Sequence, residues 1–197
     1  VANESTRLSI GATAPAPPPV EEPRRWFVGV HAAGSFDGLI ANIDGLDLDP
    51  GPGFNAGLLG GWRFSDDWAL RVEALFSMRM MEFDEADTGR EGEWRWQSVE
   101  LPVLAVWTSP WRFDLLAGLG AEMLLLAEEE NHGKTEDVLD EHLGYEADAH
   151  LGIGLPLAID PFQVRFELRG VASVLPVAAE LEGGHRWRAA LGADFIF

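Results

Sequence analysis

Residues 68–80, WALRVEALFSMRM, separate their side chains by odd and even position. The even positions are all apolar: Trp68, Leu70, Val72, Ala74, Phe76, Met78 and Met80. The odd positions are mostly polar or charged: Ala69, Arg71, Glu73, Leu75, Ser77 and Arg79. Successive side chains of a β-strand point to opposite faces, whereas a helix would mix the two sets. The stretch therefore predicts a strand with one apolar face and one charged face.

The chain repeats this pattern in runs separated by turn or loop residues. Eight strands are expected, at 26–36, 54–64, 68–80, 94–107, 111–127, 145–155, 162–174 and 186–197. The connections alternate between short (65–67, 108–110, 158–161) and long (37–53, 84–93, 128–144, 175–185). Strict alternation of short and long links is typical of an antiparallel up-and-down barrel. We therefore predict an all-β, eight-stranded barrel over residues 26–197, preceded by an extended Pro-rich arm at residues 1–25.

The position of the glycines indicates which face of the barrel lies inside. Seven of them share the polar parity: Gly57, Gly61, Gly118, Gly120, Gly152, Gly154 and Gly192. A narrow lumen leaves little room for side chains, so the polar face is expected inside and the bulky apolar face outside. A soluble lipocalin-like barrel would have the reverse arrangement, whereas a transmembrane barrel has this one. No run of about 18 apolar residues predicts a spanning helix.

The tryptophans support a membrane barrel because they gather near the strand ends. Those near the short links are Trp26, Trp62, Trp68, Trp107 and Trp111. Those toward the long links are Trp94, Trp96 and Trp187. Two such belts match the two interfaces of a membrane.

Four segments carry a family resemblance: Gly53–Phe64 (GFNAGLLGGWRF), Leu70–Met80 (LRVEALFSMRM), Val99–Trp107 (VELPVLAVW) and Leu115–Gly120 (LLAGLG). With them the chain resembles the small outer-membrane β-barrels of Gram-negative bacteria, in particular the OmpA/OmpX-like and PorT-like group. Its end, with Phe195 and Phe197 on the apolar parity, is similar to the signal that the barrel-assembly machinery of these bacteria recognises. The resemblance implies an outer-membrane location, with both termini, the short turns and the arm in the periplasm.

The inward parity carries equal numbers of acids and arginines. The bases are Arg63, Arg71, Arg79, Arg112, Arg165, Arg169, Arg186 and Arg188, and the acids are Glu73, Glu100, Asp114, Glu122, Glu146, Asp148, Glu167 and Asp194. Eight strands leave an interior that side chains can fill, so a formally neutral, ion-paired plug is expected. The alternative is a narrow passive channel for ions or small solutes.

A lipid A-modifying enzyme is the third possibility, because some eight-stranded barrels have that activity. It would need a serine, a histidine base and an orienting acid within reach of lipid. His31 and His150 have inward parity, and Ser35, Ser77, Ser98 and Ser173 have no partner nearby in sequence. We therefore expect no catalytic residues and no cofactor.

The 197-residue chain has a net charge of −19 and no cysteine. Most of the excess acid falls in the long links, so acidic extracellular loops are expected, and nucleic acid is excluded as a partner. Asp44, Asp47 and Asp49 are weak candidates for binding Ca²⁺ or Mg²⁺. We predict a structural or interaction protein that contacts outer-membrane lipid and lipopolysaccharide, and an envelope complex through residues 1–25 or the loops.

Overall fold

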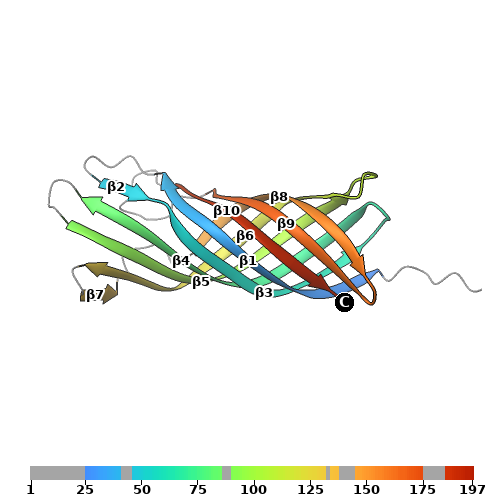
Figure 1. Cartoon of the computed structure of the whole chain (residues 1–197), viewed down its shortest axis with the longest axis horizontal. Helices are drawn as coiled ribbons and strands as arrows, with labels where there is room; N and C mark the ends of the chain where they lie inside the picture. Colours follow the sequence, from blue (N-terminus) through green and yellow to red (C-terminus); the bar gives the residue numbers. More distant parts are fainter. Residues whose placement is uncertain (1–24, 41–45, 86–89, 132–133, 138–144, 175–184) are drawn as a thin grey trace, which may run out of the picture.

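A computed structural model describes residues 25–40, 46–85, 90–131, 134–137, 145–174 and 185–197. Eight long antiparallel strands form a closed barrel (Figure 1): β1 Trp26–Ile40, β3 Gly51–Arg63, β4 Trp68–Glu85, β5 Arg90–Thr108, β6 Asp114–Asn131, β8 Tyr145–Ile159, β9 Phe162–Ser173 and β10 His185–Ile196. Two short strands, β2 Leu46–Asp49 and β7 Lys134–Asp137, add to the edges of β4 and β6. In the described part of the chain, no helix is long and apolar enough to cross a membrane.

Each barrel strand pairs with its neighbours in sequence, and the first strand pairs with the last. The β1–β10 ladder runs from Gly29 opposite Ile196 to Ile40 opposite His185. This closure leaves no free edge among the eight long strands. The predicted antiparallel up-and-down barrel is thereby confirmed.

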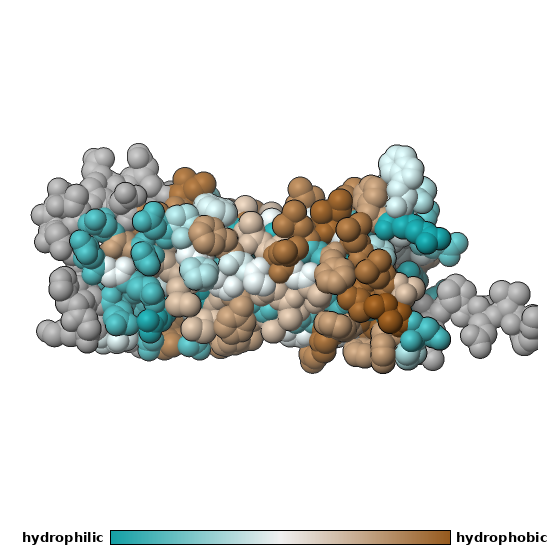
Figure 2. Space-filling model, viewed as in Figure 1, coloured by the Kyte–Doolittle hydropathy of each residue, from teal (hydrophilic) through white to brown (hydrophobic). Residues whose placement is uncertain are grey.

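The two faces of the wall differ in polarity as the alternation predicts. Outward side chains such as Leu151 are apolar and largely exposed, at 69% for that residue, whereas inward Arg71 is 0% exposed. Brown, hydrophobic surface in Figure 2 gathers over the part of the barrel near the short turns, and teal surface covers the opposite end. A soluble barrel with an apolar interior is excluded by this arrangement.

Most of the strands are longer than predicted, so parts of the expected loops are strand. β4 and β5 have 18 and 19 residues, and β1 continues to Ile40. Beyond the apolar wall, β4, β5 and β6 continue with β2 and β7 at their sides, at the left of Figure 1. We call this the projecting sheet: residues 46–49, 80–85, 90–97, 126–131 and 134–137. Its described outward side chains include the charged Glu82, Asp84, Glu93 and Arg95, so the apolar alternation that reveals the wall strands fades there.

A bulge in β6 changes which residues face inward. Gln97 lies opposite Leu126 and Ser98 opposite Leu124, so Leu125 has no opposite residue. An extra residue of this kind shifts the side-chain alternation by one position. Glu122 and Leu124 therefore face inward before the bulge, whereas Ala127 and Glu129 do so after it.

Candidate functional site: the filled lumen and the projecting sheet

The part of the lumen toward the short turns holds a compact ion-pair cluster from β4, β9 and β10. Arg169 donates two hydrogen bonds to the Glu73 carboxylate, at 2.7 and 2.8 Å. Arg71 contacts Glu73, Glu167 at 2.8 Å and Asp194 at 2.7 Å. Charged groups buried in this way are stable only when they are paired and hydrogen-bonded. The cluster therefore ties three strands together across the interior.

Two further contacts extend this cluster. Arg165 pairs with Asp114 at 2.8 Å. The His31 ring lies between Asp194 and Asn55, 2.6 Å from the carboxylate oxygen and 2.9 Å from the amide oxygen. Both ring nitrogens of His31 thus have partners within the protein.

A second cluster lies further toward the projecting sheet. Arg188 binds the Glu100 carboxylate with both terminal nitrogens, one of them at 2.7 Å. Arg79 contacts Glu122 and donates to the Ser98 hydroxyl at 2.9 Å. This cluster connects β4, β5, β6 and β10.

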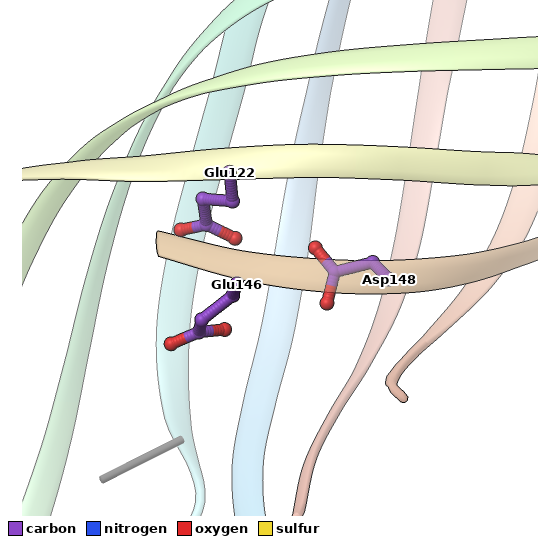
Figure 3. Close-up of side chains that lie close together, drawn as sticks. All are labelled: Glu122, Glu146 and Asp148. Atoms are coloured by element: carbon purple, nitrogen blue, oxygen red, sulfur yellow. The ribbon is translucent and has the colours of Figure 1, made fainter. Parts of the chain in front are cut away.

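Three carboxylates of the second cluster lie near one another in a way that could suit a cation. Glu122 from β6 and Glu146 and Asp148 from β8 each offer an oxygen within 4.8 Å of the others (Figure 3). The Arg186 guanidinium, however, contacts Glu122, Glu146 at 2.9 Å and Asp148 at 3.2 Å. The protein therefore supplies its own cation to this group.

The expected balance of eight acids and eight arginines is wrong. Arg112 is exposed in the turn between β5 and β6, at φ 63°, where its amide donates to the Ser109 carbonyl at 2.9 Å. Arg63 lies half-buried at the rim, with its guanidinium 5.8 Å from the centre of the Phe27 ring. Asp37, expected in a loop, is buried and accepts a 2.6 Å hydrogen bond from Ser35.

With these changes, the described residues bury more acid than base. The buried arginines are Arg71, Arg79, Arg165, Arg169, Arg186 and Arg188, and the buried acids are Asp37, Glu73, Glu100, Asp114, Glu122, Glu129, Glu146, Asp148, Glu167 and Asp194. The turn at residues 109–113 explains the error for Arg112. It is longer than the predicted 108–110, so the strand parity did not apply to that residue.

Apolar clusters close the lumen on both sides of the charged layers. Near the short turns the members are Phe27, Leu59, Ala69, Leu104, Val106, Leu116 and Ile196. Near the projecting sheet they are Leu39, Met81, Trp96, Leu124 and Ala127, with Leu48 and Trp94 packed against them. We call these the lower and upper apolar layers. The lumen thus alternates apolar, charged and apolar along its axis.

The upper apolar layer corrects the expected position of two tryptophans. Trp96 is only 5% exposed and lies inside the barrel, not at a membrane interface. Trp94 packs on the same layer and donates to Glu129 at 3.2 Å. Both residues share the even parity of Glu100 in β5, and this signal in the sequence could have placed them inside.

Two small cavities lie among the described residues of the lumen. One is lined by Leu39, Met81 and Trp96 among others, and the other by His31, Asn55 and Leu75 among others. Each has a volume of about 10 Å³. Because a single water needs roughly 10–15 Å³, each of these two cavities has room for about one water.

The other tryptophans lie on or near the outer surface. Trp26 and Trp62 form an edge-to-face pair with ring centres 4.1 Å apart, at the short-turn end, where Trp68 and Trp107 are paired across β4 and β5. Trp111 belongs to the 109–113 turn and is 83% exposed. Trp187 lies toward the other end, on the outward parity of β10 opposite Gly38.

The C-terminal phenylalanines lie on the outer surface at the short-turn end. Phe195 and Phe197 are both about half exposed, and the Phe197 ring packs edge-to-face on Phe162 at 5.6 Å. The Phe197 amide donates to the Val28 carbonyl at 2.8 Å. Recognition of these residues by the assembly machinery remains a prediction.

The four serines considered for catalysis all make hydrogen bonds with other groups of the barrel. Ser35 and Ser77 donate to Asp37 and Glu100, and Ser98 and Ser173 accept from Arg79 and the Arg186 amide. His150 is buried in the lumen. Asp44 and residues 1–24 lie outside the described residues. Asp47 and Asp49 belong to β2, opposite Asp84 and Glu82.

The outward face of the projecting sheet carries carboxylates in register. Asp49 lies opposite Glu82, Glu82 opposite Glu93, and Glu93 opposite Glu130, which makes a row across four adjacent strands. Arg95 contacts Glu93 and lies 3.1 Å from Glu130. Like charges directly opposite one another destabilise a sheet. This row was not predicted, because Asp49, Glu93 and Glu130 were assigned to loops and Glu82 lay beyond the end of its predicted strand.

Comparison with known proteins agrees with the architecture. The family model described as outer membrane protein beta-barrel domain matches residues 13–178. No curated protein sequence is significantly similar to the chain. Among solved structures, Neisserial surface protein A is 10% identical with a TM-score of 0.50, over 86% of this chain and 95% of that one. Ail, the attachment invasion locus protein of Yersinia pestis, is 18% identical with a TM-score of 0.46, over 88% and 100%.

Proposed function

Because this chain belongs to the outer membrane protein beta-barrel domain family, we propose that it is a non-conducting, non-enzymatic barrel of the bacterial outer membrane that acts by binding a partner. The observation that carries this proposal is the filled lumen. A solute crossing the barrel would have to displace two apolar layers and the ion pairs between them.

The energetics of the charged layers support a closed state. Opening a path beside Arg169 and Glu73 would break two charge-assisted hydrogen bonds, each contributing roughly 1.5–3 kcal/mol. The upper apolar layer would also have to part around Trp96, whose buried side chain closes that end. A resting pore is therefore disfavoured by several independent contacts.

The projecting sheet is the proposed interaction surface. We place it outside the cell and the short turns and both chain termini in the periplasm, because the long connections and most of the acidic side chains lie at the sheet's end. The carboxylate row from Asp49 to Glu130 destabilises the isolated sheet and would be relieved by a cationic surface. A basic protein partner, or an anionic one bridged by divalent cations, fits this charge.

The experiment that tests the closed state is single-channel recording in planar bilayers. The wild-type barrel is expected to insert without conductance steps, with insertion verified by the heat-dependent mobility of the recovered protein on a gel. Steps whose size changes in Arg188→Gln would overturn the proposal, because that residue lies in the charged layer.

Binding is tested by affinity capture from envelope extracts with the wild-type protein and with Glu82→Lys/Glu93→Lys. We expect a partner that is lost in this variant at constant barrel yield. Arg112→Glu, an exposed change in the turn at the other end of the barrel, is the matched control. Equal capture by all three proteins would contradict binding through the sheet.

A further inference from the structure

An apolar groove crosses the outer wall over β8 and β9. Its lining includes Leu115, Ala149, Leu151, Ile153, Leu168 and Gly170, and its volume is about 790 Å³. This size lies within the range of small-molecule sites, roughly 300–1,000 Å³. The groove lies on the lipid-facing side of the barrel, separate from the filled lumen.

Small side chains in register make the groove hollow. Ala149 lies opposite Ala172, and Leu151 lies opposite Gly170, whose other neighbour on β10 is Ala189. The next outward pair along these two strands is large, because Ile153 lies opposite Leu168. The wall therefore recedes over β8 and β9 beside a ridge of aliphatic side chains.

Close packing does not explain the glycine at the base of this hollow. A Cβ on Gly170 would meet only the Leu151 carbonyl oxygen, at 3.8 Å, which is an ordinary contact. In contrast, a Cβ on inward Gly118 would lie 2.0 Å from the Val103 carbonyl oxygen. Gly118 is required by the fold, whereas Gly170 leaves space on the outside that a larger residue could occupy.

The position of the groove along the barrel wall indicates which membrane leaflet it faces. Its β9 residues, 168–172, lie far along the strand from Phe162 at the short-turn end. Tyr145, which is 75% exposed, lies beyond the groove toward the opposite end, and Trp187 lies opposite the lining residue Ala172 at that end of the groove. Aromatic residues mark membrane interfaces, so the groove faces the leaflet on the side of the projecting sheet.

The shape and charge of the surroundings indicate the occupant. The hollow favours a flexible hydrocarbon chain, which can lie along its length, over a second barrel, whose convex wall would reach it only through protruding side chains. The described outward residues next to the groove's upper end are Tyr145, Ala147, Val174, His185 and Trp187, and none of these five is acidic. The carboxylate row lies across β2, β4, β5 and β6, so an anionic headgroup above the groove meets no carboxylate from these residues.

We propose that this groove holds one acyl chain of an outer-leaflet lipid as a retained, specific ligand. Assignment to the outer leaflet rests on the orientation given under Proposed function, but the existence of the site does not. Attraction comes from close packing, since lipid tails and the groove are equally apolar. A chain lying in a complementary hollow makes more such contacts than one against a convex wall.

The test is photolabelling of the full-length barrel in nanodiscs made with a phosphatidylcholine that carries a diazirine in one acyl chain. Labelled peptides are mapped by mass spectrometry in the wild type, Gly170→Leu and Gly34→Leu. Gly34 is the matched control, because it faces outward on β1 at the level of Leu191 and Leu168, and a Cβ there meets nothing within 4 Å.

We expect excess labelling of residues 149–153 and 168–172 in the wild type and in Gly34→Leu, and its loss in Gly170→Leu. Even labelling around the wall, or loss in both variants, would overturn the site. Covalent dimers joined through β8 and β9 would identify a second copy as the occupant and would also overturn it. Because symmetric nanodiscs contain the same lipid in both leaflets, these results do not depend on the orientation or on conductance.

Discussion

Replacing Arg169 with methionine removes a buried cation whose partners remain in the lumen. In the wild type, Arg169 makes two hydrogen bonds to Glu73 and one, at 2.5 Å, to Glu167. After the change, Glu73 keeps only Arg71, which also serves Glu167 and Asp194. Leaving such a charge incompletely paired costs about 3–5 kcal/mol, so we expect the free energy of unfolding to fall by that amount.

The assay is urea unfolding of the barrel in lipid vesicles, followed by tryptophan fluorescence, with the slope of the transition checked for each variant. The double variant Arg169→Met/Glu73→Gln removes the stranded charge as well. It should be less destabilised than the sum of the single variants by about 1–3 kcal/mol, because residues in one network are coupled.

The control is Arg63→Met at the half-buried rim, where the Arg63 guanidinium donates a 3.3 Å hydrogen bond to the Gln163 side chain. We expect it to cost less than about 1 kcal/mol. An Arg169→Met loss no larger than that of the control, or strict additivity in the double variant, would refute the ion-pair account of the lumen.

Three further predictions use the same unfolding assay. Trp96→Ala should lower the free energy of unfolding by about 3–5 kcal/mol, because it leaves a cavity in the upper apolar layer. Trp111→Ala, in the exposed turn, should change it by less than about 1 kcal/mol. Similar losses for the two variants would contradict the inward position of Trp96. Gly57→Ala should prevent or strongly impair folding, because its Cβ would lie 2.0 Å from the Ala74 carbonyl oxygen. Gly34→Ala should be neutral or stabilising by up to about 1 kcal/mol. A well-folded Gly57→Ala would show that β3 and β4 lie further apart than in this structure. Arg112→Gly should stabilise by about 1 kcal/mol, since a residue with a side chain is strained at φ 63° and glycine is not; a destabilised variant would indicate a different backbone at that turn.

Alternation in the sequence was enough to predict the wall of the barrel, because one face meets lipid and the other meets side chains. It failed where that contrast ends. The outward residues of the projecting sheet, such as Glu82 and Glu93, are as polar as loop residues, so nothing in the pattern marks them as strand.

The lumen was predicted in composition but not in arrangement. The odd–even alternation correctly predicted that Arg71, Glu73, Arg169 and Asp194 face the lumen. Which of these side chains form ion pairs, however, depends on the strand register and on the tilt of the strands. The register also contains a bulge at Leu125 that no local signal revealed. The wrong position predicted for Trp96 has a different cause. Its even parity, shared with Glu100, indicates an inward side chain, whereas a tryptophan near a strand end is typical of a membrane interface.

The pairing of β1 with β10 makes the closed barrel depend on residues at both ends of its sequence. The two strands share twelve matched positions, although one lies near the start of the barrel sequence and the other ends it. Without residues 185–196, β1 would have no neighbour on that side, and the sheet would be an open ribbon with two unpaired borders. A truncation that removes β10 should therefore yield an aggregation-prone chain in place of a smaller barrel.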